Sequence, residues 1–185
     1  MPSAAKRQCT IKRTTKETDI NLTFTVDGSG KAAISTGVPF MDHMLTLFTV
    51  HGFFDLSVQA SGDTDVDDHH TVEDLGICLG QALRKALNEY TSIKRYGEFS
   101  VPMDETLIRA TMDLSNRPYL HYEVTIPEPK VGTFDTELAK EFLRAFSLHA
   151  GMTLHIDMIR GENSHHIIEA IFKAVSKALD IATTI

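Results

Sequence analysis

The stretch His69-His70-Thr71-Val72-Glu73 occurs twice in this chain, since it returns as His165-His166-Ile167-Ile168-Glu169. Each copy opens an apolar stretch of helical period, and residues four apart lie on the same face of a helix. The first histidine of each copy therefore lies beside its glutamate, whereas the second points about 100° away around the helix axis. Two such helix openings that face each other would form two metal sites. Each site would take a histidine and a glutamate from one helix and one histidine from the other.

The hydrophobic pattern around the first motif predicts a mixture of strands and helices. Period-two alternation predicts strands over about residues 20–26, 31–35 and 54–60, and helical periodicity predicts helices over about residues 41–51 and 69–90. The strand at 31–35 is expected to return after a turn at residues 27–30. Residues 1–8 are polar and are expected to fray.

The second half of the chain repeats this order. Alternation predicts strands over about residues 108–114, 120–126 and 154–158, and helices are predicted over about residues 136–149 and 165–179. Glu17-Thr18-x-Ile20 matches Glu105-Thr106-x-Ile108, and no linker separates the halves. We therefore expect one α+β domain, 1–185, made of two fused repeats at about 9–92 and 93–185. Two antiparallel or mixed sheets should pack on a layer of four helices.

Composition and charge narrow the function classes. The chain has 185 residues, 42% of them hydrophobic and 23% charged, which is ordinary for a globular protein. Its net charge of −7 argues against a nucleic-acid partner. The two cysteines, Cys9 and Cys78, form no disulfide framework, which indicates a reduced, cytoplasmic setting. No signal segment or membrane span is predicted, although a plastid location is possible if a transit peptide was removed.

Equivalent positions in the two halves nominate a fourth ligand for each metal site. His43 precedes His51 by the same spacing that separates Glu141 from His149. The predicted ligand sets are His43, His70, His165 and Glu169 for one site, and His69, Glu73, Glu141 and His166 for the other. Such ligands suit Mn, Fe, Co, Ni or Zn. Asp67 and Asp68 are expected either to cap the helix, to accept hydrogen bonds from the imidazole rings, or simply to form a solvated acidic loop.

Several of these motifs together resemble the imidazoleglycerol-phosphate dehydratases of histidine biosynthesis. The stretches that carry the resemblance are Phe40-Met41-Asp42-His43-Met44, Asp67-Asp68-His69-His70-Thr71-Val72-Glu73-Asp74, Gly161-Glu162-Asn163-Ser164-His165-His166, Arg95-Tyr96-Gly97, Met103-Asp104-Glu105 and Ser115-Asn116-Arg117-Pro118-Tyr119. They span about residues 13–182. The resemblance implies a lyase with two Mn²⁺ per active site that converts imidazole glycerol phosphate to imidazole acetol phosphate. It also implies a homo-oligomeric shell of twenty-four subunits with active sites at subunit contacts.

The implied reaction accounts for two metal ions. The substrate's imidazole ring has two nitrogens, and an ion on each would favour the anionic ring. Electron density from that anion would expel the neighbouring hydroxyl, and a base would then take a proton to give an enol that becomes the ketone. The resemblance nominates Glu17 as this base, although an exposed strand glutamate is the alternative. Glu169 is predicted as a second catalytic residue.

The resemblance also implies a set of substrate contacts. Arg95 and Arg117 match family positions that contact the phosphate, for which guanidinium groups are well suited. Lys173 is either a further phosphate contact or a solvated surface lysine, and His51 is either a substrate contact or a helix-end histidine. The full set predicted to contact substrate is Glu17, His43, His51, His69, His70, Arg95, Arg117 and Lys173.

Two features depart from the family pattern. Many members have histidine where Glu141 stands, and family chains continue into a Ser-Thr-Lys-Gly segment beyond Ile185. We therefore expect slower turnover than in a chain extended by that segment. Two alternative functions remain open from the residues alone: a dimetal phosphoester hydrolase and a non-catalytic metal-storage bundle.

Overall fold

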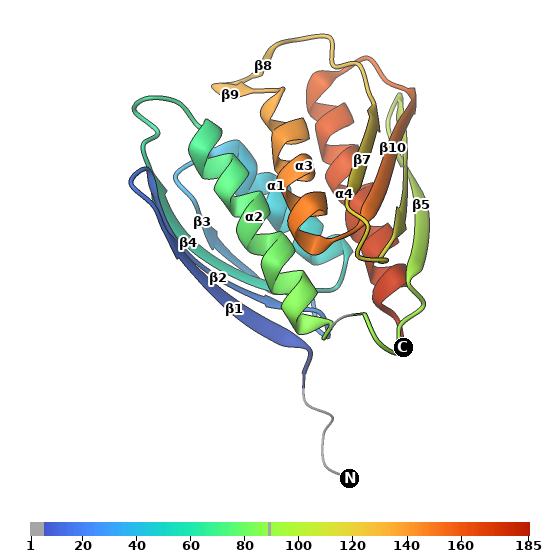
Figure 1. Ribbon diagram of the computed structural model, residues 1–185. Coiled ribbons are helices and arrows are strands. Elements are labelled where there is room, and N and C mark those ends of the chain that lie inside the picture. The colour runs from blue at the N-terminus through green and yellow to red at the C-terminus, as the bar shows by residue number, and fades with distance from the viewer. Residues whose placement is uncertain (1–5, 89) are drawn as a thin grey trace.

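The computed structural model describes residues 6–88 and 90–185, and in it four helices lie between two four-stranded sheets (Figure 1). The first half contains β1 (Gln8–Thr14), β2 (Thr18–Thr25), β3 (Ala32–Ser35), α1 (Pro39–His51), β4 (Asp55–Gly62) and α2 (His69–Ala86). The second half contains β5 (Tyr96–Met103), β6 (Thr106–Asp113), β7 (Tyr119–Glu123), β8 (Lys130–Val131), β9 (Phe134–Asp135), α3 (Leu138–Ala150), β10 (Thr153–Arg160) and α4 (Ser164–Thr183). The predicted α+β class is confirmed.

The two sheets have the same topology, which confirms the internal duplication. The strand orders are β1-β2-β4-β3 and β5-β6-β10-β7. In each sheet three neighbouring strands are antiparallel, and the fourth, β3 or β7, joins one edge in parallel. The short β8–β9 hairpin has no counterpart in the first half.

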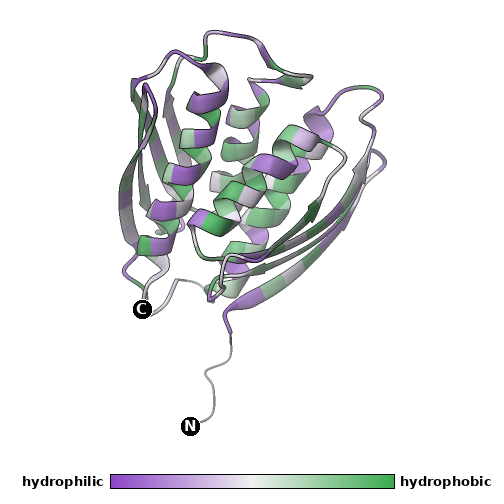
Figure 2. Ribbon diagram, turned by 180° about the vertical axis from the view of Figure 1, so that it is seen from behind, coloured by the Kyte–Doolittle hydropathy of each residue, from purple (hydrophilic) through white to green (hydrophobic). Residues whose placement is uncertain are grey.

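The inner faces of both sheets and the facing sides of the helices form the core. Along β2 the side chains of Ile20, Leu22 and Phe24 are buried and alternate with polar neighbours. Figure 2 shows hydrophobic and hydrophilic colours alternating along the strands of the sheets. Helix α2 packs on β1 and β2 and against α3, while α4 packs on β5 and β6 and against α1. A fully buried side chain of this size contributes about 1.5–3 kcal/mol to stability, so these faces dominate the folding energy.

Local sequence determines where the histidine-bearing helices begin. Asn163 caps α4, and its side-chain oxygen accepts hydrogen bonds from the backbone N–H groups of His165 and His166. The Asp67 carboxylate accepts one from the backbone N–H of His69, whereas Asp68, the N-cap residue of α2, makes no side-chain cap bond. Both histidine pairs therefore lie in first turns, at the end of the molecule opposite the C-terminus and the start of β1 (Figure 1).

The structure corrects several predicted elements. Strand 31–35 does not pair with β2, because β4 lies between them and β3 joins its far side in parallel. Strand 120–126 is likewise parallel to β10 and shorter than expected. A turn signal identifies a change of direction, but it does not identify the neighbour that the strand will pair with.

Element boundaries differ for local reasons. The helix predicted over 69–90 ends at Ala86, where the backbone turns and Asn88 adopts a positive φ of 44°; its predicted end crosses residue 89, which lies outside the described residues. Strand β1 begins at Gln8, inside the segment expected to fray, whose first five residues also lie outside the described part. Strands β1 and β5 were not predicted, because most of their side chains are polar or exposed. No described helix is long and apolar enough to cross a bilayer.

Candidate active site

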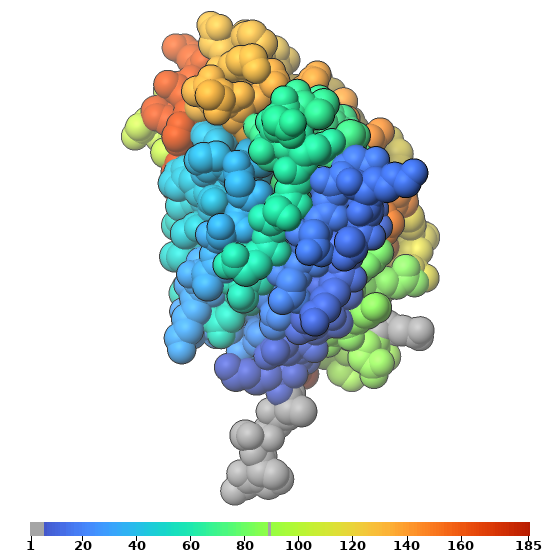
Figure 3. Space-filling model, turned by 90° about the vertical axis from the view of Figure 1, so that its left-hand side faces the viewer, coloured from blue at the N-terminus to red at the C-terminus, as the bar shows by residue number. Residues whose placement is uncertain are grey.

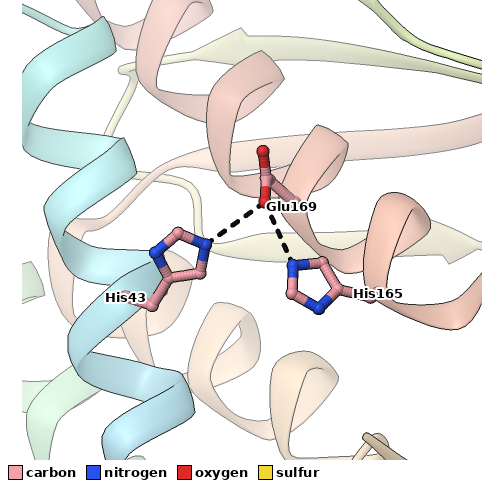
Figure 4. A group of neighbouring side chains, drawn as sticks. All are labelled: His43, His165 and Glu169. Atoms are coloured by element: carbon pink, nitrogen blue, oxygen red, sulfur yellow. Dashed lines mark hydrogen bonds and ion pairs between the residues drawn. The ribbon is translucent and has the colours of Figure 1, made fainter.

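Helices α1 and α4 bring three predicted ligands together, which we call the α1/α4 half-site: His43, His165 and Glu169. The Nε2 atoms of His43 and His165 lie 3.3 and 3.2 Å from Glu169 Oε2, as Figure 4 shows. One ligand atom from each residue falls within a group in which all separations are under 4.8 Å. Two imidazole nitrogens and a carboxylate at this spacing fit a divalent ion.

Glu169 is the buried member of the half-site, with only 7% of its surface exposed. Burial raises the pKa of its carboxyl group, but the charge of Lys173 and its 2.6 Å hydrogen bond from Nζ to Oε1 lower it, as do the hydrogen bonds with His43 and His165. The resulting pKa is below the ordinary value, so Glu169 is a carboxylate ready to bind a cation.

Helices α2 and α3 carry three further predicted ligands, His69, Glu73 and Glu141, which we call the α2/α3 half-site. Among the described residues only the α1/α4 trio has its ligand atoms within 4.8 Å of one another, so this second group is more open. His69 Nε2 lies 3.9 Å from Glu73 Oε2, as expected for residues four apart on a helix. Arg144 forms ion pairs with both glutamates, and its Nη2 lies 3.9 Å from Glu73 Oε1. The guanidinium of Arg144 thus links the two carboxylates, and a metal ion at this half-site would have to displace it from them.

The remaining two predicted ligands, His70 and His166, join neither half-site within one chain. The Nδ1 of His70 lies 2.9 Å from Asp63 Oδ2, and the Nδ1 of His166 lies 2.9 Å from Glu105 Oε2. Each hydrogen bond raises the pKa of the histidine that it binds. The two predicted four-ligand sets are therefore each one histidine short in the described part of a single chain.

Glu17, the candidate base, lies in the turn between β1 and β2, exposed beside the loop that follows β4. It lines an open hollow of about 340 Å³ with residues 14–19 and 61–63. The backbone N–H of Asp63 donates to the Glu17 carbonyl at 3.1 Å. Figure 3 shows the β1–β2 turn in blue next to the β4–α2 loop in green. Glu17 therefore lies near His70, at the same end of the molecule as the histidine motifs.

The predicted phosphate-binding arginines lie at the other end of α4. Asp113 holds both of them: Arg95 Nε donates to it at 2.6 Å and Arg117 Nη2 at 3.2 Å. The backbone N–H of Arg95 donates to the carbonyl of Ala182, near the C-terminal end of α4. A helix of 20 residues is about 30 Å long, so these arginines are remote from His165 in the same chain.

Lys173 and His51 lie near the α1/α4 half-site instead. Lys173 contacts Glu169 as described, and the pKa of His51 is lowered first by burial and then by the charges of Lys173 and Lys177. A lowered pKa favours the neutral imidazole. Lys173 is thus held in place by an ion pair and is not a freely solvated surface lysine.

The contacts of Asp63 and Glu105 with His70 and His166 were not predicted. We call His70 and His166 the outward histidines. The match between Glu105 and Glu17 was a usable signal, since it identified a repeated acidic position ahead of a strand. Nothing in the spacing singles out Asp63 within its acidic loop. Its contact with His70 depends on how the loop folds after β4.

Comparisons with known proteins match one family over most of the chain. The family model for imidazoleglycerol-phosphate dehydratase matches residues 36–179. The imidazoleglycerol-phosphate dehydratase of Halalkalibacterium halodurans is 61% identical over 97% of this chain and 92% of its own length. That of Bacillus subtilis is 61% identical over 94% and 89%, respectively.

Two solved structures share the fold. The crystal structure of the dehydratase from Staphylococcus aureus matches with a TM-score of 0.87 and 47% identity, covering 96% of this chain and 98% of that one. The enzyme from Pyrococcus furiosus, solved in complex with (S)-C348, matches with a TM-score of 0.83 and 39% identity, covering 94% and 93%.

Proposed function

The chain belongs to the imidazoleglycerol-phosphate dehydratase family, and on that premise we propose that it works at two Mn²⁺ ions held between neighbouring copies of itself. As a member, it is a carbon–oxygen lyase that converts imidazole glycerol phosphate to imidazole acetol phosphate and water in histidine biosynthesis. Neither the storage bundle nor the phosphoester hydrolase has support in the fold or the family. Two free cysteines agree with a reducing compartment, and the cytoplasm is the proposed location.

One observation supports the proposal: His43, His165 and Glu169 gather at metal-binding spacing, while His70 and His166 hydrogen-bond to acids outside either half-site. His70 follows His69 in the first turn of α2, so it moves together with the α2/α3 half-site, and we call this part of the surface the α2/α3 end. His166 follows His165 on α4 in the same way. If that end of one copy faces the α1/α4 end of another, both four-ligand sets are completed at once.

This arrangement requires self-association, because neither four-ligand set is complete among the described residues of one chain. Each copy would present two different surfaces at that end of the molecule, one around each half-site, so contacts would continue around a closed assembly. The resemblance to the family implies twenty-four subunits, and that number is part of the proposal. Arg95 and Arg117, at the far end of α4, would likewise bind the substrate phosphate of an active site formed by neighbouring copies.

Glu17 is the proposed base for the proton transfer. When bound, the two ions supply Lewis acidity that stabilises negative charge on the substrate ring. No side chain among residues 6–88 and 90–185 hydrogen-bonds to the Glu17 carboxylate, so it is free to accept a proton. The carboxylate of Glu105, its counterpart in the repeat, is already bonded to His166 and to two backbone N–H groups. Only Glu17 is therefore available for chemistry.

Complementation between inactive variants tests the shared site. His70→Ala damages the α2/α3 end of a chain, and His166→Ala damages the α1/α4 end. Each variant alone should lose activity. In oligomers assembled from an equal mixture of the two, random pairing should restore roughly one quarter of the wild-type activity, because half of the chains supply each intact end.

The matched control mixes His70→Ala with His69→Ala, which damage the same end. This mixture should remain inactive, since no active site can obtain an intact α2/α3 end. Equal recovery in both mixtures, or none in either, would contradict the proposed sharing. Bound Mn²⁺ should be measured in every preparation, with formation of the ketone product followed by its absorbance.

A further inference from the structure

The two outward histidines have matching environments that the repeat does not explain. His70 and His166 each point Nδ1 at a carboxylate oxygen 2.9 Å away. The partner of His70, Asp63, follows β4, whereas the partner of His166, Glu105, precedes β6. β4 corresponds to β10 and β6 to β2 in the repeated topology. The same contact is therefore made from non-equivalent positions.

Close packing at two glycines gives the residue correspondence directly. A Cβ at Gly62 would meet Thr71 and Thr18, and a Cβ at Gly161 would meet Ile167 and Thr106, which are the matching residues of the other half. Gly62 thus corresponds to Gly161, and the next residues, Asp63 and Glu162, correspond to each other.

If the duplication had passed on these histidine–carboxylate contacts, equivalent residues of the two halves would make them. In the second half, Glu162 is exposed and does not bond to His166, which is bonded by the counterpart of Glu17 instead. In the first half, the task falls to Asp63 and Glu17 is left free. A geometry reached from two different positions indicates a requirement of the site and not a remnant of the repeat.

From this geometry we infer that Asp63 and Glu105 are positioning residues that hold His70 and His166 ready to bind the metal ions of a neighbouring copy. The inference rests on the proposed metal sites. A carboxylate only accepts hydrogen bonds, so the ring nitrogen that faces it must carry the proton. The proton is then on Nδ1, and the lone pair of Nε2 is free for a metal ion. Such partners fix the tautomer and orientation of ligating histidines.

The two carboxylates should respond differently to amide substitution. Glu105 Oε1 accepts backbone N–H groups from Glu162 and Asn163 at 3.2 and 2.8 Å. In Glu105→Gln these donors keep the amide oxygen on their side, so the NH₂ group faces His166. That donor would require Nδ1 to accept and Nε2 to carry the proton, which is the wrong tautomer for metal binding.

Asp63 has no such constraint. Its second oxygen, Oδ1, is buried without a hydrogen-bond partner in the described part of the chain. In Asp63→Asn the amide can therefore turn its oxygen toward His70 and keep the proton on Nδ1. Asp63→Ala removes the acceptor altogether. We expect Asp63→Asn to retain most of the Mn²⁺ affinity and Asp63→Ala to lose it.

The test is a Mn²⁺ binding isotherm, with free Mn²⁺ measured by electron paramagnetic resonance. Glu105→Gln and Asp63→Ala should each lower the affinity for one of the two Mn²⁺ ions by about 10- to 100-fold, as loss of such partners typically does. Glu162→Gln, the repeat counterpart of Asp63, and Asp65→Asn, in the same loop as Asp63, are matched controls and should bind both ions as the wild type does. Unchanged melting of the metal-free variants would separate positioning from a general loss of stability.

A double-variant cycle makes the result decisive. Adding Asp63→Ala to His70→Ala should weaken binding no further, because the carboxylate acts only through that ring. If His70→Ala weakens one ion while Asp63→Ala and Glu105→Gln bind as the wild type does, the inference is wrong and the proposed sites stand. If wild-type protein binds no Mn²⁺, or His70→Ala binds it unchanged, the proposed sites themselves fail.

Discussion

Glu17 and Glu105 occupy equivalent turns in the two halves, yet their carboxylates are used differently. The hydrogen bonds that Glu105 accepts lower the pKa of its carboxyl group far below the usual range, with the His166 contact the largest cause. It is therefore a poor proton acceptor. Glu17 lines an open hollow instead. At the scale of single residues, equivalent positions of the two halves carry the same acid, but the loops around them leave only the carboxylate of Glu105 bonded to a histidine.

Glu17→Gln should abolish most of the turnover without affecting the metal ions. An amide of the same shape cannot accept the proton, and loss of a positioned general base typically costs about 10²- to 10⁴-fold in rate. We expect kcat to fall by that factor while Mn²⁺ stoichiometry and KM change little. Steady-state kinetics with metal analysis of the same samples provides the measurement. Loss of Mn²⁺ in this variant would show that Glu17 is a ligand and not the base.

Asp113 predicts a pH dependence of stability. The hydrogen bond from Arg95 is the largest cause that lowers the pKa of Asp113, against the effect of burial. A carboxyl group whose folded pKa is below its unfolded value of about 3.9 stabilises the fold above about pH 4. That contribution disappears as the pH falls through the folded-state pKa.

Denaturant unfolding of wild type and Asp113→Asn checks this sign. Near neutral pH the variant should be less stable, and the difference should shrink as the pH falls below about 4. The comparison should use metal-free protein, so that ligand titration does not contribute. A difference that grows on acidification would contradict the assignment.

At the scale of elements, the close contact of α2 with α3 controls the second half-site. A Cβ at Gly80 would lie 2.7 Å from the Phe146 carbonyl and 2.8 Å from the Ala150 nitrogen. Gly76 is similarly confined against Phe142 and Ala145. Glu73 and Glu141 lie on these two helices, so the Mn²⁺ proposed to bind both of them would require the helices to remain this close.

Gly80→Ala should therefore destabilise the protein even though alanine favours helices by about 1 kcal/mol. The backbone of α3 cannot yield without moving the helix, and overpacking of this kind typically costs about 1–3 kcal/mol. We expect a lower free energy of unfolding and weaker binding of one Mn²⁺. Arg84→Ala, an exposed position on the same helix, is the control and should change stability by less than about 0.5 kcal/mol. A Gly80→Ala protein as stable as the control would show that the helices can separate freely.

At the scale of the whole molecule, metal binding and self-association should be coupled. Each proposed ion bridges two copies, so its binding energy contributes to the assembly. Removal of Mn²⁺ with a chelator should lower the molar mass in solution, and added Mn²⁺ should restore it, as measured by light scattering after gel filtration. Glu17→Gln should assemble as the wild type does. The proposal would be contradicted if wild-type protein that holds Mn²⁺ kept the same molar mass after the metal is removed. The ions would then lie within single chains.

Much of the architecture could be predicted from residue patterns. Period-two alternation located β2, β4, β6 and β10, because a strand with one buried face must alternate. It did not locate β1 and β5, which pair along sheet edges with few buried side chains. Nor could it show that β3 and β7 join in parallel, because pairing depends on contacts between segments distant in sequence.

The candidate ligands were all visible in the sequence, since His-His-x-x-Glu places its side chains by helix geometry alone. The chain by itself thus determined the family, the duplicated α+β fold and the chemical types of the site. The tertiary structure decided which of those residues meet. It separated His70 and His166 from the half-sites and gave them Asp63 and Glu105 as partners, because loops and sheet edges follow contacts that no local period encodes.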